Sequence, residues 1–205
     1  MFRVSIPSRF IVLLCLVLFL GAHNSGASLQ ATDSNPAAAA QFPAMLRIEP
    51  ALSLVPIGGT ACADVRVENI EGLFGFETVI QFDPSRVNVV DANPAAPGIQ
   101  ITIGPFLQPQ NPSHWFVINS ADNVKGTIRV AITRMSPEVG VSGSGVLATV
   151  CLLGVNRGHS SLAFSETATL MLDPQVASLS FEPKSGGALV GPVQRHRIPL
   201  ISRGF

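Results

Sequence analysis

The feature that most constrains the fold is an alternation of apolar and polar residues that begins after Ala44. The segment 61–68 reads ACADVRVE, so an apolar residue recurs at every second position. In the segment 74–82, FGFETVIQF, the residues Phe76, Thr78 and Ile80 share one side. Because successive side chains of a strand point to opposite faces of a sheet, this period of two predicts half-buried β-strands.

Turn-forming residues divide the rest of the alternating region into further strands. Runs typical of strands occupy 46–57, 86–90, 99–103, 115–118, 127–133, 146–155, 162–172 and 188–190. The run 162–172 is long enough to contain a bend. Turns are expected at Asn93-Pro94, Pro97-Gly98, Asn111-Pro112, 121–123, Gly143-Ser144-Gly145 and 156–158. Eighteen Gly and 16 Pro fit this pattern, and no window after residue 44 has helical periodicity. The predicted fold class is all-β, an antiparallel two-sheet sandwich.

The first residues have the pattern of an export signal. Arg3 and Arg9 precede an apolar run at 10–20, which small residues follow. This run is shorter than the roughly 20 residues that a membrane-spanning helix needs, so an uncleaved anchor is the minority reading. We therefore expect a secreted or cell-surface protein with no stable membrane span in its mature form. The expected parts are a signal peptide at 1–27, a flexible linker at 28–44, the sandwich at 45–192 and a tail at 193–205.

Export also affects how the cysteines are interpreted. Outside the predicted signal peptide the sequence contains Cys62 and Cys151. Disulfides persist in extracellular compartments, so a single bridge between them is the favoured hypothesis. The alternative is two buried free thiols. Two cysteines so far apart lack the paired spacing of a metal site, and no metal ligands are expected.

Charge and motif content argue against several classes of function. The sequence has 13 basic and 13 acidic residues, so no overall positive field would attract nucleic acid. His114, His159 and His196 share no ligand spacing. The segment 140–145, GVSGSG, does not match the G-x-S-x-G pattern of a serine nucleophile and is interpreted as a flexible turn. Phosphate-binding glycine loops are also missing from the sequence. We predict a non-enzymatic protein without a cofactor.

Several segments, taken in order, carry a resemblance to a known family. They are IGGT at 57–60, VRVEN at 65–69, LFGFETVIQFDPSRVNVV at 73–90, GTIRVA at 126–131 and GSGVLATV at 143–150. Residues 46–190 therefore resemble a cohesin domain, the module with which scaffolding proteins of bacterial polysaccharide-degrading complexes capture dockerins. The resemblance implies a jelly roll of about nine strands. It also places 61–67 beside 147–155, with Ala148, Val150 and Leu152 inward and both cysteines outward on neighbouring strands.

The resemblance also implies where a partner binds. In cohesins the outward side chains of one sheet meet the dockerin helices, and an acidic residue is typical where Glu77 stands. The corresponding partner-binding residues here are Gly75, Glu77, Val79, Gln81, Thr127, Arg129, Ala131 and Thr133. The implied partner is a dockerin-bearing protein that carries its own calcium, because this sequence has no Asp/Asn-rich calcium loop. The alternative reading of the same residues is an ordinary solvated sheet face.

Two other classes of function stay open. Carbohydrate-binding modules share the sandwich architecture, so polysaccharide is a second candidate ligand. A sugar platform usually needs exposed aromatic rings, whereas the sequence has no Tyr and a single Trp, Trp115, which we interpret as a core or rim anchor. A structural or adhesive role at the cell surface is the third class.

Overall fold

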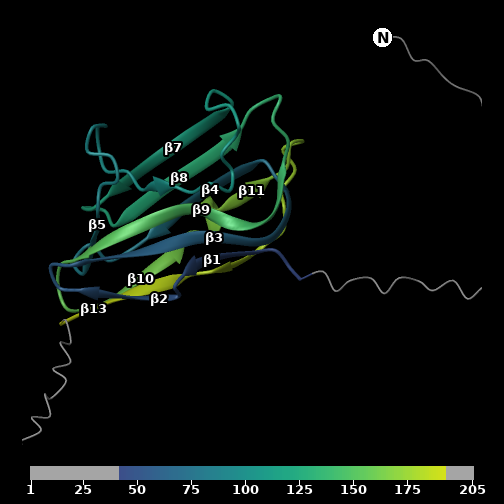
Figure 1. Ribbon diagram of the computed structural model, residues 1–205. Helices are drawn as coiled ribbons and strands as arrows, with labels where there is room; N and C mark the ends of the chain where they lie inside the picture. Colours follow the sequence, from purple (N-terminus) through teal and green to yellow (C-terminus); the bar gives the residue numbers. More distant parts are fainter. Residues whose placement is uncertain (1–41, 193–205) are drawn as a thin grey trace, which may run out of the picture. The chain divides into compact units, whose positions relative to one another are not determined.

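A computed structural model describes residues 42–192, which fold into two facing β-sheets (Figure 1). The predicted signal peptide, most of the predicted linker and the predicted tail lie outside the described residues. The first sheet has six strands in the order β12-β1-β3-β9-β5, with β6 also paired to β9. Its strands are β1 (Met45–Glu49), β3 (Thr60–Leu73), β5 (Val87–Val89), β6 (Thr102–Ile103), β9 (Val141–Gly154) and β12 (Glu182–Lys184).

The second sheet has seven strands in the order β2-β13-β10-β4-β8-β7, with β11 paired to β4. Its strands are β2 (Leu52–Pro56), β4 (Gly75–Gln81), β7 (Trp115–Asp122), β8 (Thr127–Arg134), β10 (Gly158–Phe164), β11 (Leu170–Leu172) and β13 (Gly186–Gly191). A single 3₁₀ turn, Glu166–Ala168, lies between β10 and β11. Neighbouring strands are antiparallel except for the β1–β12 and β2–β13 pairs.

The core lies between the sheets and follows the predicted alternation. Phe76, Thr78 and Ile80 are almost completely buried from β4, and Ala148, Val150 and Leu152 are buried from β9. The buried Thr78 hydroxyl is hydrogen bonded to the Thr169 hydroxyl at 2.8 Å, so its burial does not leave a polar group unsatisfied. The predicted all-β sandwich is confirmed. The described residues form thirteen strands rather than about nine, because several are short and the run 162–172 bends into β10, the 3₁₀ turn and β11.

The turn predicted at Gly143-Ser144-Gly145 is wrong, because β9 begins at Val141 and continues through these residues. The same holds for the flexible turn expected at 140–145. The pairing of β9 with β3 shifts register in this region. The Ser144 and Ser142 hydroxyls accept hydrogen bonds there from the backbone N–H groups of Asn69 and Gly72. The serine hydroxyls thus accept hydrogen bonds that backbone carbonyl oxygens of β9 would accept in a regular β3–β9 pairing, and the strand remains continuous.

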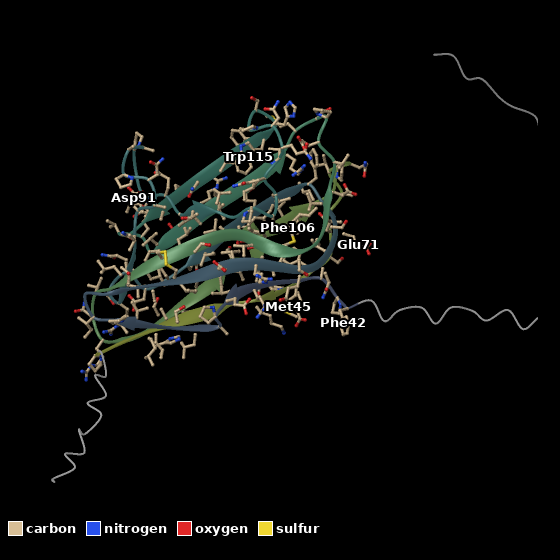
Figure 2. All side chains as sticks on the ribbon, in the orientation of Figure 1. Phe42, Met45, Glu71, Asp91, Phe106 and Trp115 are labelled. Atoms are coloured by element: carbon tan, nitrogen blue, oxygen red, sulfur yellow. A yellow bond between two sulfur atoms is a disulfide. The ribbon has the colours of Figure 1, made fainter. Side chains whose placement is uncertain are left out.

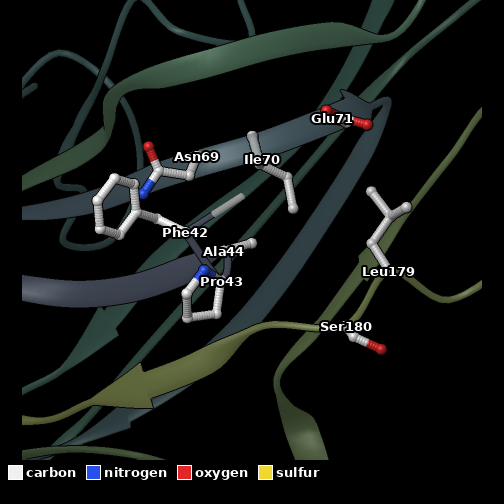
Figure 3. Close-up of a pocket in the computed structure, with 8 residues that line it drawn as sticks. All are labelled: Phe42, Pro43, Ala44, Asn69, Ile70, Glu71, Leu179 and Ser180. Carbon is white, nitrogen blue, oxygen red and sulfur yellow. The ribbon is translucent and has the colours of Figure 1, made fainter. Parts of the chain in front are cut away.

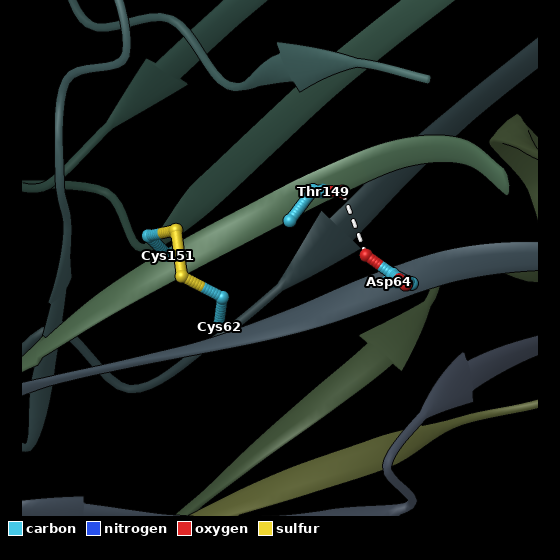
Figure 4. The surroundings of a disulfide bond; sticks show 4 residues. All are labelled: Cys62, Asp64, Thr149 and Cys151. Atoms are coloured by element: carbon cyan, nitrogen blue, oxygen red, sulfur yellow. Dashed lines mark hydrogen bonds between the residues drawn. A yellow bond between two sulfur atoms is a disulfide. The ribbon is translucent and has the colours of Figure 1, made fainter. Parts of the chain in front are cut away.

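The predicted disulfide is confirmed, and the free-thiol alternative is wrong (Figure 4). Cys62 of β3 and Cys151 of β9 are directly opposite one another in the strand register. Both lie on the outer side of the six-stranded sheet, since their neighbours Ala63, Val150 and Leu152 are buried. Two residues further along β3, Asp64 accepts a hydrogen bond from the Thr149 hydroxyl at 2.6 Å. Residues 42–192 contain no helix that is long and apolar enough to cross a membrane.

Candidate functional site

The eight residues predicted to bind a partner lie together on two neighbouring strands of the seven-stranded sheet. In the β4–β8 register they form four cross-strand pairs: Gly75 with Thr133, Glu77 with Ala131, Val79 with Arg129, and Gln81 with Thr127. All eight are on the outer side, because the residues that alternate with them belong to the core. The structure thus brings the predicted residues onto one continuous face, which we call the β4–β8 face.

This face extends onto two further strands, β11 and β7, whose outward residues are not among the eight predicted ones. Two rows across β11, β4, β8 and β7 form its centre: Leu172, Gly75, Thr133, Phe116 and Leu170, Glu77, Ala131, Ile118. The flanking positions are thus held by large apolar residues where alternation would lead one to expect polar ones. These apolar residues at outward positions are visible in the sequence and could have indicated an exposed apolar surface. The pairing of β11 with β4, however, depends on a bend that local periodicity does not locate.

Exposure differs between the centre and the sides of the face. Ala131 is only 8% exposed and Gly75 is buried, although both point outward by register. Glycine has no side chain and alanine only a methyl group, so both contribute little surface beside larger neighbours. Phe116 is 57% exposed and Leu170 is 37% exposed. The face therefore has small residues on its two central strands and larger apolar side chains on the strands at either side.

A single ion pair, Glu77 with Arg129, lies near the centre of the face. The Nε and Nη2 groups of Arg129 donate hydrogen bonds to Glu77 Oε1 at 3.2 and 2.8 Å. The side chains are 53% and 32% exposed for Arg129 and Glu77, respectively. An ion pair this accessible to water contributes at most about 1 kcal/mol to stability. Its groups can therefore exchange partners at little cost when another molecule binds.

The hairpin that joins β7 to β8 closes the polar end of the face. Asp122 Oδ1 accepts hydrogen bonds from the backbone N–H groups of Lys125 and Val124, both at 2.9 Å. The pKa of the Asp122 carboxyl is held below its ordinary value of 3.8, chiefly by the hydrogen bond from the Lys125 backbone and then by that from Val124. The nearby Lys125 ammonium lowers it further. A cavity of about 480 Å³ adjoins this hairpin. Its lining includes Ile99, Ser120, Val124, Thr127 and Arg129.

A second cavity, of about 300 Å³, lies away from the β4–β8 face (Figure 3). Phe42, Asn69 and Leu179 are among the residues that line it, and none of the eight predicted partner-binding residues does. Trp115 is half-buried and packs against the core (Figure 2). Its position fits the predicted anchor role. Within residues 42–192 no group of three or more His, Cys, Asp and Glu residues is placed to hold a metal ion.

No family model and no curated protein matches the sequence. Solved structures do match the fold. A type II cohesin domain from the cellulosome of Acetivibrio cellulolyticus is 15% identical, with 72% of this chain and 95% of that chain covered and a TM-score of 0.61. A non-cellulosomal cohesin from the archaeon Archaeoglobus fulgidus is 15% identical, with 75% and 94% covered and a TM-score of 0.56. A type I cohesin–dockerin complex from Clostridium thermocellum contains a chain that is 14% identical, with 73% and 100% covered and a TM-score of 0.56.

The chain has the fold of cohesin modules. At this identity the likeness concerns the fold alone, because folds of this kind host more than one function. The match covers nearly the full length of the cohesins compared. Residues 46–190 resemble cohesins in sequence. This range nearly coincides with the described residues, 42–192, which form the sandwich.

Proposed function

We propose that this chain is a non-catalytic cohesin-type module that binds a dockerin-type partner through the β4–β8 face. Two observations support the proposal. The chain has the fold of cohesins, one of which was solved in a complex with a dockerin. The second observation is the composition of this face. We further propose that the protein is exported, that it works in extracellular polysaccharide degradation or surface assembly, and that the partner supplies the calcium.

The observation that carries the proposal is the arrangement of large apolar residues around the exposed pair Glu77–Arg129. Four strands at a spacing of about 4.8 Å place β11 and β7 about 14 Å apart. An α-helix with its side chains is about 10–12 Å wide. A helix therefore fits over the small residues Gly75 and Ala131 while its sides contact Leu170 and Phe116. Such an interface would have apolar contacts along both sides of the helix and a charged pair near its centre that fixes the register.

Binding measurements with a panel of dockerins, in calcium and in chelator, test this function. The deciding variant is Glu77→Lys, which reverses one charge and places it beside Arg129. We expect affinity for the bound dockerin to fall roughly 100-fold, because a like charge is then held at the centre of the interface. The matched control is Glu182→Lys. It makes the same change in an exposed Glu–Lys pair of β12, on the other sheet, and should leave affinity unchanged.

Glycan binding is the competing outcome. Soluble and insoluble polysaccharides are tested in parallel with the same variants. Binding to a polysaccharide with no affinity for any dockerin would contradict the proposal and favour the carbohydrate-binding alternative. An equal loss of dockerin affinity in Glu77→Lys and Glu182→Lys would contradict the placement of the interface.

A further inference from the structure

The hairpin that follows β11 is held by a single aspartate. Asp173 Oδ1 accepts hydrogen bonds from the backbone N–H groups of Gln175 and Ala177, both at 2.8 Å. The backbone N–H of Val176 donates to the carbonyl oxygen of Asp173 at 3.0 Å. A bridge between Leu172 and Ser178 closes the base of the hairpin. The loop therefore has a defined shape in which the conformation of each residue is set by its neighbours.

Val176 occupies a backbone conformation that suits glycine. Its φ is +64°, in the left-handed region, where a β-branched residue is a clear outlier. Tight hairpins of this kind usually place Gly or Asn at that position. The β7–β8 hairpin follows this rule: it too has an aspartate that accepts two backbone N–H groups, and Gly126 stands at φ +69°. A valine at the equivalent conformation raises the free energy of the folded state.

Core packing does not offset this cost. The Val176 side chain is 73% exposed, so nearly all of its apolar surface remains in water. A residue that is both strained and exposed destabilises the isolated fold without an evident gain within the described residues. Strained residues that persist in a structure are concentrated at functional and ligand-binding sites. The observation thus suggests that the valine side chain serves a contact outside the chain.

The hairpin emerges beside the apolar end of the β4–β8 face. Backbone hydrogen bonds link the strand ends there in a row: Phe74 N–H donates to Leu172, Arg134 N–H to Phe74, and Met135 N–H to His114. The loops after β11 and β8 therefore leave the sheet at the same end (Figure 1). This end also carries exposed apolar residues on the loop after β8, Met135 at 41% and Val139 at 71%.

We propose that Val176 is an apolar anchor for the dockerin-type partner. One end of the partner helix lies over the Gly75–Thr133 row, and Val176 contacts an apolar side chain at that end. This inference rests on the proposed function. It goes further by giving the interface a direction, because the last outward row of the strands at the opposite end is polar, with Gln81, Thr127 and Asp122. The apolar end of the bound helix then points toward the β11 hairpin.

The test compares stability and affinity in the same variants. Val176→Gly and Val176→Asn both suit the left-handed conformation and remove the apolar side chain. We expect the melting temperature to rise by a few degrees while dockerin affinity falls about tenfold. The control is Asn69→Gly, at the other non-glycine residue with positive φ among residues 42–192, with φ 53°, on β3 of the six-stranded sheet. It should leave affinity unchanged.

The outcomes separate this inference from the proposed function. If wild type binds a dockerin, Glu77→Lys lowers that affinity as expected and both Val176 variants bind as wild type does, the anchor is overturned and the function stands. A lower melting temperature in both variants also overturns the anchor, since the valine would then be supporting the fold. If wild type binds no dockerin, both proposals fail. A wild-type dimer that Val176→Gly converts to a monomer would assign the surface to a second copy of the chain and overturn the inference.

Discussion

The outer faces of the two sheets differ in what their side chains contact. On the six-stranded sheet, Arg47, Glu49, Arg66 and Glu68 of β1 and β3 form one network of ion pairs at 2.8–3.9 Å. Nearby, Asp64 accepts a hydrogen bond from Thr149, and the disulfide links β3 to β9. These groups find their partners within the same face.

The outer face of the seven-stranded sheet has the opposite character. Near the centre of the β4–β8 face the ion pair Glu77–Arg129 lies beside exposed Phe116 and Leu170. Further along the sheet, Leu52, Leu54 and Leu189 of β2 and β13 are also 42–70% exposed. Exposed apolar residues gathered on one sheet face in this way are typical of interaction sites. Both sheets follow the same alternation, so the identity of the outward residues is what distinguishes a closed face from one available to a partner.

Removing the disulfide should have the largest effect on stability and none on binding. Cys62 and Cys151 are separated by 89 positions, and a loop of that size implies a loss of about 4 kcal/mol in the free energy of unfolding when it is opened. The double variant Cys62→Ser/Cys151→Ser is measured by urea unfolding, with the fluorescence of Trp115 as the signal. Wild type in reductant should match it. Dockerin affinity below the unfolding transition should not change, and a fall in affinity would show that the two faces are coupled.

Variants of Phe116 and Leu54 test whether the partner binds the β4–β8 face alone or the whole outer face of the sheet. Both are exposed apolar residues, at 57% and 70%, but Leu54 lies on the edge strand β2, four strands from β8 in the sheet order. Phe116→Ser should lower dockerin affinity about tenfold, or about 1.4 kcal/mol, because it removes apolar contact area at the side of the face. Leu54→Ser should leave affinity unchanged. Titration calorimetry measures both, and equal losses would place the partner across the whole sheet.

Much of this organisation could be predicted from the sequence, since it depends on local alternation. The inward residues of β4 and the outward side of Cys62 follow from a period of two. The resemblance to cohesins implied the inward residues of β9, the outward Cys151 and the choice of the eight residues of the β4–β8 face. The flanking residues Phe116 and Leu170 could not be placed on the face, because strand order and register are set by long-range pairing. The left-handed conformation of Val176 was also unpredictable, since valine gives no turn signal.

The smallest expected effect concerns the polar end of the β4–β8 face. The β7–β8 hairpin begins there at Asp122. Its carboxyl pKa is lowered below 3.8, chiefly by hydrogen bonds from the backbone N–H groups of Lys125 and Val124. A carboxyl with a lowered pKa in the folded state stabilises the fold above its unfolded pKa, and the contribution is lost as the pH falls through the folded pKa. Wild type should therefore melt above Asp122→Ala by a constant margin at neutral pH. That margin should shrink below about pH 4.

Melting curves followed by circular dichroism between pH 7 and pH 2.5 measure this margin. Asp83, whose pKa is also lowered, chiefly by its hydrogen bonds with Ser85, is present in both proteins, so its titration cancels in the difference. A margin that stays constant down to pH 2.5 would mean that the Asp122 side chain acts through its shape rather than its charge. In that case the polar end of the face would owe its order to the turn conformation alone.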